Sequence, residues 1–125
     1  MFTLFHHPFC PHSRFIRLIV GEYGLDLKLV EERSWERREA FLLLNAAGTT
    51  PVLVDEEQPP IPGAAIIAEY VDEAYGAGMG PKRLMPETLG ERVEVRRLMA
   101  WFNEKFFEEV SHPLVTERIY KRFMS

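Results

Sequence analysis

Residues 2–30 contain a strand, a helix and a second strand in that order, which strongly limits the folds open to the chain. An apolar run from Phe2 to His6 predicts a buried strand. Apolar residues at helical spacing predict a mostly buried helix from Ser13 to Tyr23, which Gly24 ends. The alternation from Leu25 to Val30 predicts a half-buried strand. Two strands that flank a helix are expected to pair in parallel through a right-handed crossover.

The next segment extends this pattern with a helix, a hairpin and another helix. Ser34 is expected to cap a second helix that runs through Phe41 to Leu44. A strand at Pro51–Val54 and a short edge strand beginning at Ile61 predict an antiparallel hairpin. Apolar residues from Ile66 to Ala74 repeat at helical spacing. The order β-α-β-α-β-β-α therefore predicts an α/β fold, in which three helices cover a mixed sheet.

The last third of the chain predicts a different architecture. The glycine-rich stretch Gly76–Pro81 is expected to be a linker. After Pro86 the chain is expected to form an amphipathic helix, which Pro113 interrupts before a last helical turn or two. Its expected apolar face consists of Val95, Leu98, Met99, Phe102, Phe106 and Val110, widened by Trp101 and Phe107. One such helix cannot bury its own aromatic residues, so the chain is expected to be a fragment or to complete its core by association.

Composition excludes several classes of protein. The net charge is −4, from 15 basic and 19 acidic residues that interleave, which argues against a nucleic-acid-binding surface. The single cysteine excludes an internal disulfide and fits a reducing compartment. No apolar run approaches the roughly 20 residues that span a bilayer, and no signal peptide is visible. We therefore expect a cytoplasmic protein that binds neither nucleic acid nor membrane.

The segment Cys10-Pro11-His12-Ser13 lies where the first strand gives way to the first helix. Unpaired N–H groups and the helix dipole stabilise a thiolate at such a place, which would activate the Cys10 thiol. A lone cysteine is, however, more often a small buried hydrophobic residue. A metal site built on Cys10 with His6, His7 and His12 is disfavoured, because adjacent histidines on a strand point to opposite faces.

These motifs together resemble the glutathione transferase superfamily. Cys10-Pro11-His12-Ser13 is similar to its Cys-Pro-x-Ser, and the segment 45–53 (NAAGTTPVL) to its Asn-Pro-x-Gly-x-Val-Pro-x-Leu. The segment 67–73 (IAEYVDE) resembles its third helix, and Leu84-Met85-Pro86 the start of its second domain. The resemblance implies a thioredoxin-like domain over residues 1–79. Residues 80–125 would form a linker and the beginning of an all-helical domain.

The resemblance also implies roles for individual residues, with glutathione as co-substrate. Cys10 or Ser13 would face the glutathione sulfur. Cysteine at this place tends toward thiol transfer, whereas serine holds glutathione as a thiolate for attack on electrophiles. Pro51 would be a cis-proline, which turns the N–H and C=O of Thr50 toward the cysteinyl part of glutathione.

The sequence departs from the family at the start of the third helix. The family usually has Glu-Ser there, and the serine and the helix N-terminus receive the γ-glutamyl carboxylate. Gly63 and Ala64 occupy these two positions, and Thr49 stands where a lysine often meets the glycyl carboxylate. The backbone N–H groups remain, but two polar side-chain contacts, each worth ~1–3 kcal/mol, are lost.

Two functions therefore compete at this point. Cys-Pro-x-Ser favours an enzyme that transfers glutathione or exchanges thiols, with a small-molecule thiol and an electrophile as partners. Gly63-Ala64 favours a non-catalytic binding protein, as in bacterial members that bind the cell-division filament protein FtsZ. The segment 112–118 (HPLVTER) with Lys121-Arg122 is similar to that branch. The resemblance also implies a homodimer.

Overall fold

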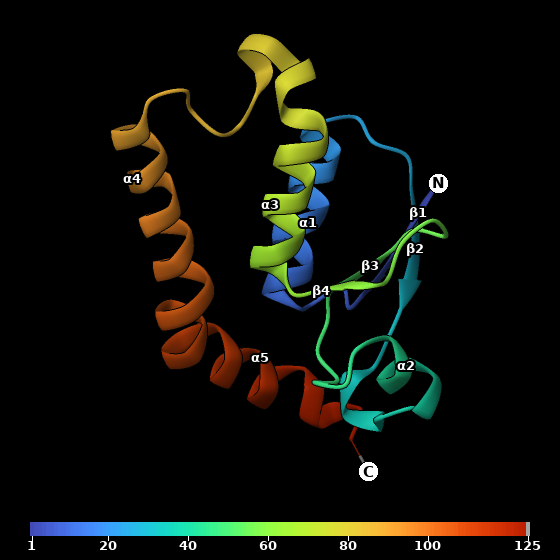
Figure 1. Ribbon diagram of the computed structural model, residues 1–125. Coiled ribbons are helices and arrows are strands. Elements are labelled where there is room, and N and C mark those ends of the chain that lie inside the picture. Colours follow the sequence, from blue (N-terminus) through green and yellow to red (C-terminus); the bar gives the residue numbers. More distant parts are fainter. Residues whose placement is uncertain (125) are drawn as a thin grey trace.

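The computed structural model describes residues 1–124 and contains one four-stranded mixed sheet. The strands are β1 (Phe2–His6), β2 (Leu27–Glu31), β3 (Val52–Val54) and β4 (Ile61–Pro62), in the spatial order β2-β1-β3-β4. β1 pairs in parallel with β2 and antiparallel with β3, which forms the antiparallel hairpin with β4 (Figure 1). The predicted α/β fold, the parallel crossover and the edge strand are confirmed.

Helices cover both faces of this sheet. α1 (Pro11–Glu22) and α3 (Ala64–Tyr75) lie side by side on one face (Figure 1). The core between them and the sheet contains Leu4, Ile16, Val20, Tyr23, Leu53, Ile67 and Val71. Because side chains alternate along a strand, Phe5 points to the opposite face. There its ring lies 6.0 Å from that of Phe41 in α2 (Glu39–Leu44).

The second helix begins later than predicted. Ser34 lies inside a short 3₁₀ turn, η1 (Ser34–Glu36), and is not the N-cap of a longer helix. Arg37 has φ +50°, so the backbone is left-handed between this turn and α2 and cannot continue a helix. Arg38 follows as the N-cap of α2, and its guanidinium pairs with the buried carboxylate of Glu32 at 2.6 and 3.2 Å. The predicted helix start at Ser34 is therefore wrong.

The glycine-rich stretch is not an open linker. Residues 76–82 continue from α3 as 3₁₀ turns, η2 (Gly76–Lys82). Gly76 packs against the ion pair between Asp72 of α3 and Arg83, whose N–O distances are 2.9 and 2.8 Å. A Cβ atom at Gly76 would lie 2.6 Å from Asp72 Oδ1, so a larger residue here would displace the ion pair. The hydroxyl of Tyr23 accepts a hydrogen bond from the backbone N–H of Leu84, which fastens the next residues.

One long helical run forms the C-terminal part. α4 (Leu89–Ala100) passes into a π-helical segment, η3 (Trp101–Ser111), then into α5 (His112–Arg118) and the turn η4 (Tyr120–Arg122). Pro113 does not end it: the residue lies where the π-helical segment passes into α5, and the backbone stays helical on both sides. Figure 1 shows the run descending beside α3 and then crossing beneath it, so that the C-terminal end lies near α2.

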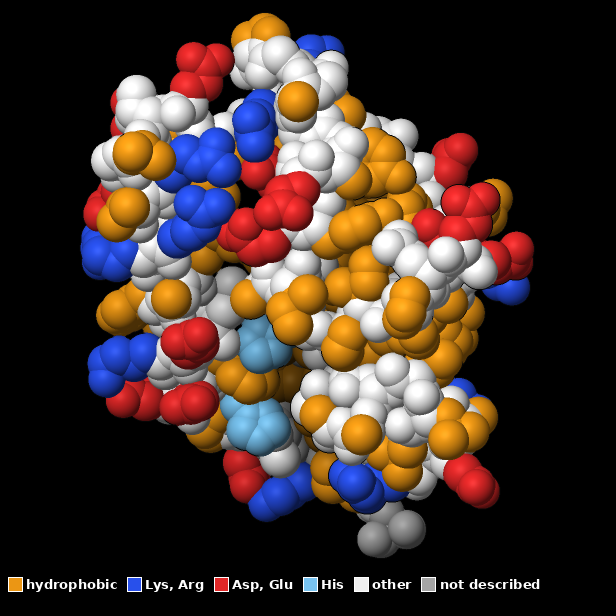
Figure 2. Space-filling model, viewed as in Figure 1, with side chains coloured by type: hydrophobic (Ala, Val, Ile, Leu, Met, Phe, Trp, Pro, Cys, Tyr) orange, Lys and Arg blue, Asp and Glu red, His pale blue; other side chains and the backbone are white. Residues whose placement is uncertain are grey.

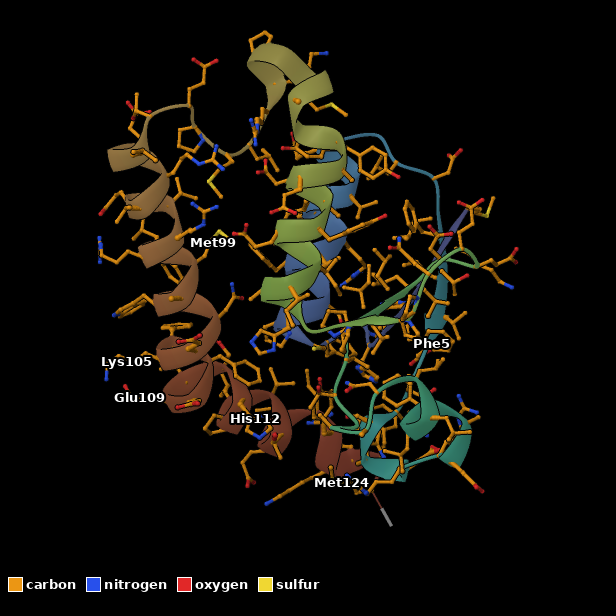
Figure 3. All side chains as sticks on the ribbon, viewed as in Figure 1. Phe5, Met99, Lys105, Glu109, His112 and Met124 are labelled. Atoms are coloured by element: carbon orange, nitrogen blue, oxygen red, sulfur yellow. The ribbon has the colours of Figure 1, made fainter. Side chains whose placement is uncertain are left out.

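The predicted apolar face of this run is divided in the structure. Met99 points toward α1 and α3 and packs against their core, whereas Lys105 and Glu109 point away (Figure 3). Other members of the predicted face are exposed by 42% or more: Leu98, Trp101, Phe102 and Val110. Trp101, Phe102 and Val110 lie in the π-helical segment, where hydrogen bonds run from residue i to i+5 and α-helical spacing no longer predicts one shared face. No helix within residues 1–124 is both long and apolar enough to cross a membrane.

Candidate functional site

Cys10 is the N-cap of α1, directly after the loop that leaves β1. Its backbone is extended, and Pro11 occupies the first helical turn. The Cys10 sulfur accepts a hydrogen bond from the backbone N–H of Ser13 at 3.4 Å. The side chain is 7% exposed, yet it lines a pocket. A sulfur at a helix N-terminus with an N–H directed at it is placed to hold negative charge.

Ser13 lies behind Cys10 and does not reach this pocket. The residue is fully buried, and its hydroxyl oxygen accepts a hydrogen bond from the backbone N–H of His7 at 3.3 Å. The hydroxyl therefore closes the turn between β1 and α1. Of the two residues predicted to act on sulfur, only Cys10 is among the described residues that line the pocket.

The loop before β3 brings a backbone carbonyl to the Cys10 thiol. The peptide bond between Thr50 and Pro51 is cis, and the thiol donates to the carbonyl oxygen of Thr50 at 3.7 Å. Asn45 holds this loop, because its amide donates to the carbonyl of Thr49 at 2.9 Å. The carbonyl of Pro51 accepts from the N–H of Gly63 at 3.1 Å, which places the start of α3 beside Thr50.

The predicted glutathione-binding residues lie around one open pocket of about 560 Å³. Thr50, Gly63 and Ala64 line it together with Cys10, while Pro51 is buried behind Thr50. Gly63 is the N-cap of α3, with φ +94° and no side-chain hydrogen bond to the first turn. The first N–H groups of α3 are thus available at this pocket, although the serine hydroxyl usual in the resembling family is absent.

The C-terminal run supplies the opposite wall of the pocket. His12, at the start of α1, donates from Nε2 to the carbonyl oxygen of Asn103 at 2.7 Å. Its ring lies 3.9 Å from that of Phe107, which in turn lies 5.3 Å from the ring of His112. Figure 3 shows His112 where η3 passes into α5. Figure 2 shows histidines at the surface, along the boundary between the C-terminal run and the rest of the molecule.

Tyr120 closes the pocket from the end of the chain. Its ring packs between His7 and Trp35, at centroid distances of 5.1 and 5.0 Å. Burial raises the pKa of the Tyr120 phenol, and negative charge at Cys10 raises it further. The phenol therefore keeps its proton at neutral pH.

Sequence reasoning missed this half of the site. The sequence assigned His7 and His12 no role beyond a disfavoured metal site, whereas the structure buries His7 and binds His12 to the C-terminal run. Asn103 and Tyr120 lie more than 90 residues from His12 and His7 in sequence, and only their proximity after folding reveals the pairing. Within residues 1–124, no cluster of three or more potential metal ligands is present.

The buried histidines predict an acid-sensitive fold. Burial lowers the pKa values of His6 and His7 from 6.5, and Arg17 and Arg33 respectively lower them further, while Glu31 opposes the shift. Below pH 6.5 the unfolded chain therefore binds more protons than the folded chain, and stability must fall as pH falls. We expect the free energy of unfolding in urea to decrease between about pH 7.5 and about pH 5.5.

The variant His7→Phe should flatten this dependence, because it keeps an aromatic ring without a titrating nitrogen. His112→Gln is the matched control, since the His112 side chain is exposed. A free energy of unfolding that stays constant over this pH interval in the wild type would contradict the prediction.

The chain is similar in sequence to known proteins. Residues 4–82 match the family "Glutathione S-transferase, N-terminal domain". FtsZ-localized protein A of Caulobacter vibrioides is 36% identical over 129 residues, covering 98% of this chain and 53% of the relative.

Solved structures agree with this placement. A glutathione S-transferase from Sinorhizobium meliloti superposes with a TM-score of 0.96 at 50% identity, covering 100% of this chain and 54% of its own. FzlA from C. crescentus gives a TM-score of 0.86 at 34% identity, covering 98% and 54%. The chain thus spans about half the length of the relatives that it matches.

Proposed function

Because the chain belongs to the glutathione S-transferase family, we propose that Cys10 is the nucleophile of a glutathione-dependent thiol transferase. The observation that carries the proposal is the placement of the two candidate side chains. Cys10 lines the pocket at the N-terminus of α1, whereas the Ser13 hydroxyl is buried against the backbone of His7. Because the pocket presents a thiol and not a serine hydroxyl, thiol exchange is favoured over serine-assisted attack on an electrophile.

The reaction proceeds in two exchanges. The Cys10 thiolate attacks the glutathionyl sulfur of a mixed disulfide, the disulfide bond breaks, and the released thiolate takes a proton from water. Glutathione thiolate then attacks the Cys10–glutathione disulfide, which yields oxidised glutathione and regenerates the Cys10 thiolate. No second cysteine is needed, because the incoming glutathione resolves the intermediate.

Backbone groups would hold the glutathionyl moiety. The Thr50 carbonyl, which accepts from Cys10 in this structure, can accept from the cysteinyl N–H of the substrate instead. The γ-glutamyl carboxylate would lie at the N-terminus of α3, next to Gly63 and Ala64. Since neither residue supplies a hydroxyl, we expect weaker glutathione binding than in members with Glu-Ser.

A non-catalytic role in cell division is the second candidate. It is favoured by the similarity to FtsZ-localized protein A over 98% of this chain, and by the loss of polar side chains at Gly63 and Ala64. In this case the protein would bind FtsZ filaments and its pocket would stay without glutathione. A homodimer and a cytoplasmic location are proposals that accompany both functions.

One set of measurements separates the two functions. The full-length protein is incubated with a glutathione mixed disulfide of a small thiol, and release of that thiol is followed in the presence of glutathione. In parallel, retention on immobilised glutathione and co-sedimentation with FtsZ filaments are measured. We expect thiol release and weak retention. Co-sedimentation without any thiol release would overturn the enzyme and support the filament-binding protein.

A further inference from the structure

The turn that carries Cys10 to the start of α1 is held by His7, through both its backbone and its side chain. The backbone N–H of His7 donates to the hydroxyl oxygen of Ser13 at 3.3 Å, and its carbonyl accepts from the N–H of Cys10 at 3.0 Å. The third contact uses the imidazole, because the N–H of Phe9 donates to His7 Nδ1 at 3.3 Å. One residue thus binds three positions of the turn.

The contact with Phe9 fixes which ring nitrogen of His7 carries the proton. A backbone N–H can only donate, so Nδ1 must accept with its lone pair. The imidazole is buried, and burial lowers the pKa of His7, so the ring is neutral at neutral pH. Its proton then lies on Nε2, which is 3.7 Å from a carboxylate oxygen of Glu31. The acceptor role of Nδ1 and the carboxylate beside Nε2 favour the same tautomer.

The imidazole of His7 is packed between two aromatic rings from distant parts of the chain. Trp35 of η1 lies at a centroid distance of 5.4 Å and an angle of 61°, and Tyr120 of η4 lies at 5.1 Å and 89°. These two rings also contact each other at 5.0 Å. Edge-to-face packing of this kind fixes the orientation of a ring. The direction of Nδ1 toward Phe9 therefore depends on η1 and on the C-terminal run as well as on the turn itself.

We propose that His7 is a positioning residue for Cys10. Its Nδ1 holds the N–H of Phe9 and so fixes the turn between β1 and α1. In this turn the N–H of Ser13 reaches the Cys10 sulfur at 3.4 Å, a contact that stabilises a thiolate. The C-terminal run supports this geometry through the aromatic packing on the imidazole. The inference rests on the proposed function only in so far as Cys10 acts as a nucleophile.

Two substitutions separate the acceptor of His7 from its ring. His7→Asn keeps an oxygen that can accept from the N–H two residues on, as in an Asx turn, but loses the ring. His7→Phe keeps a ring between Trp35 and Tyr120 but has no acceptor. Each full-length protein is treated with iodoacetamide at neutral pH, and modification of Cys10, the single cysteine, is followed by mass spectrometry.

We expect His7→Phe to slow the modification of Cys10 by about tenfold, as loss of a hydrogen bond to a charged sulfur implies. His7→Asn should stay within about threefold of the wild type, because the turn keeps its acceptor. If packing of the ring positioned Cys10, the order of the two variants would be reversed. That reversed order, equal rates in all three proteins, or equal slowing in both variants would overturn the inference.

The wild type provides a second test that holds even if a variant does not fold. Nitrogen-15 NMR of histidine rings distinguishes a proton on Nε2 from a proton on Nδ1, and the His7 signal is assigned through its contacts with Trp35 and Tyr120. We expect neutral His7 to carry its proton on Nε2. A proton on Nδ1 would overturn the inference, because that nitrogen could not accept from Phe9.

Failure of the proposed function has a different signature. A wild type that shows no thiol transfer, but whose Cys10 modification slows in His7→Phe and not in His7→Asn, keeps the positioned sulfur and lacks the reaction.

Discussion

Replacement of Cys10 by serine is expected to lower the rate of thiol transfer by about a thousandfold or more. A serine hydroxyl at the N-cap of α1 can still accept from the Ser13 N–H, so the helix start is kept. It cannot form the mixed disulfide on which the reaction depends. The measurement is the rate of thiol release from a glutathione mixed disulfide, with circular dichroism to verify the fold.

Ser13→Ala is the matched control for this variant. It removes the hydroxyl that accepts from the His7 N–H, which should cost about 1–3 kcal/mol of stability because a buried donor is left without a partner. The transfer rate of the folded protein should stay within a fewfold of the wild type. Loss of transfer in Ser13→Ala together with its retention in Cys10→Ser would contradict Cys10 as nucleophile.

Asp72→Ala is expected to cost roughly 3 kcal/mol of stability. Asp72 lies on α3 with its side chain 8% exposed, and Arg83 binds both carboxylate oxygens. Arg92 of α4 lies 3.8 Å from the same carboxylate. Removing the carboxylate leaves the Arg83 guanidinium, itself only 24% exposed, without its partner, and loosens the connection to α4. Urea unfolding at neutral pH measures the effect.

An exposed pair on the same two helices provides the control. Arg96 of α4 binds both oxygens of Glu69 on α3 at 3.0 and 3.2 Å, with both side chains 41% exposed. Because water screens this pair, Glu69→Ala should cost about 0–1 kcal/mol. Equal losses in the two variants would show that burial of Asp72 has no special role.

Local patterns predicted the N-terminal unit well because its elements are short and strongly patterned. Leu4 and Leu53 lie in apolar runs, and both are buried in the sheet beneath α1 and α3. The predicted start of the second helix is wrong. Ser34 has a side chain typical of an N-cap, but the left-handed backbone of Arg37 ends the turn that Ser34 begins. Sequence propensity has little power to predict such a single-residue reversal.

The C-terminal run shows where helical periodicity fails as a guide. The spacing of Phe102 and Phe106 predicts one shared apolar face with Met99 under ordinary α-helical geometry. The π-helical segment changes the angle between successive residues, so Met99 packs on the core while Phe102 is 55% exposed. Pro113 likewise lies in the first turn of α5 and does not end the run.

The sequence by itself determined that Cys10 stands at a helix start and that Pro51 follows Thr50 before a strand, because both depend on neighbouring residues. Only the tertiary structure decided that Cys10 faces the pocket while Ser13 is buried, since both lie within the same helical turn. It also decided that Tyr120 closes this pocket, since its contact with His7, 113 residues away in sequence, depends on how the helical run packs against the sheet.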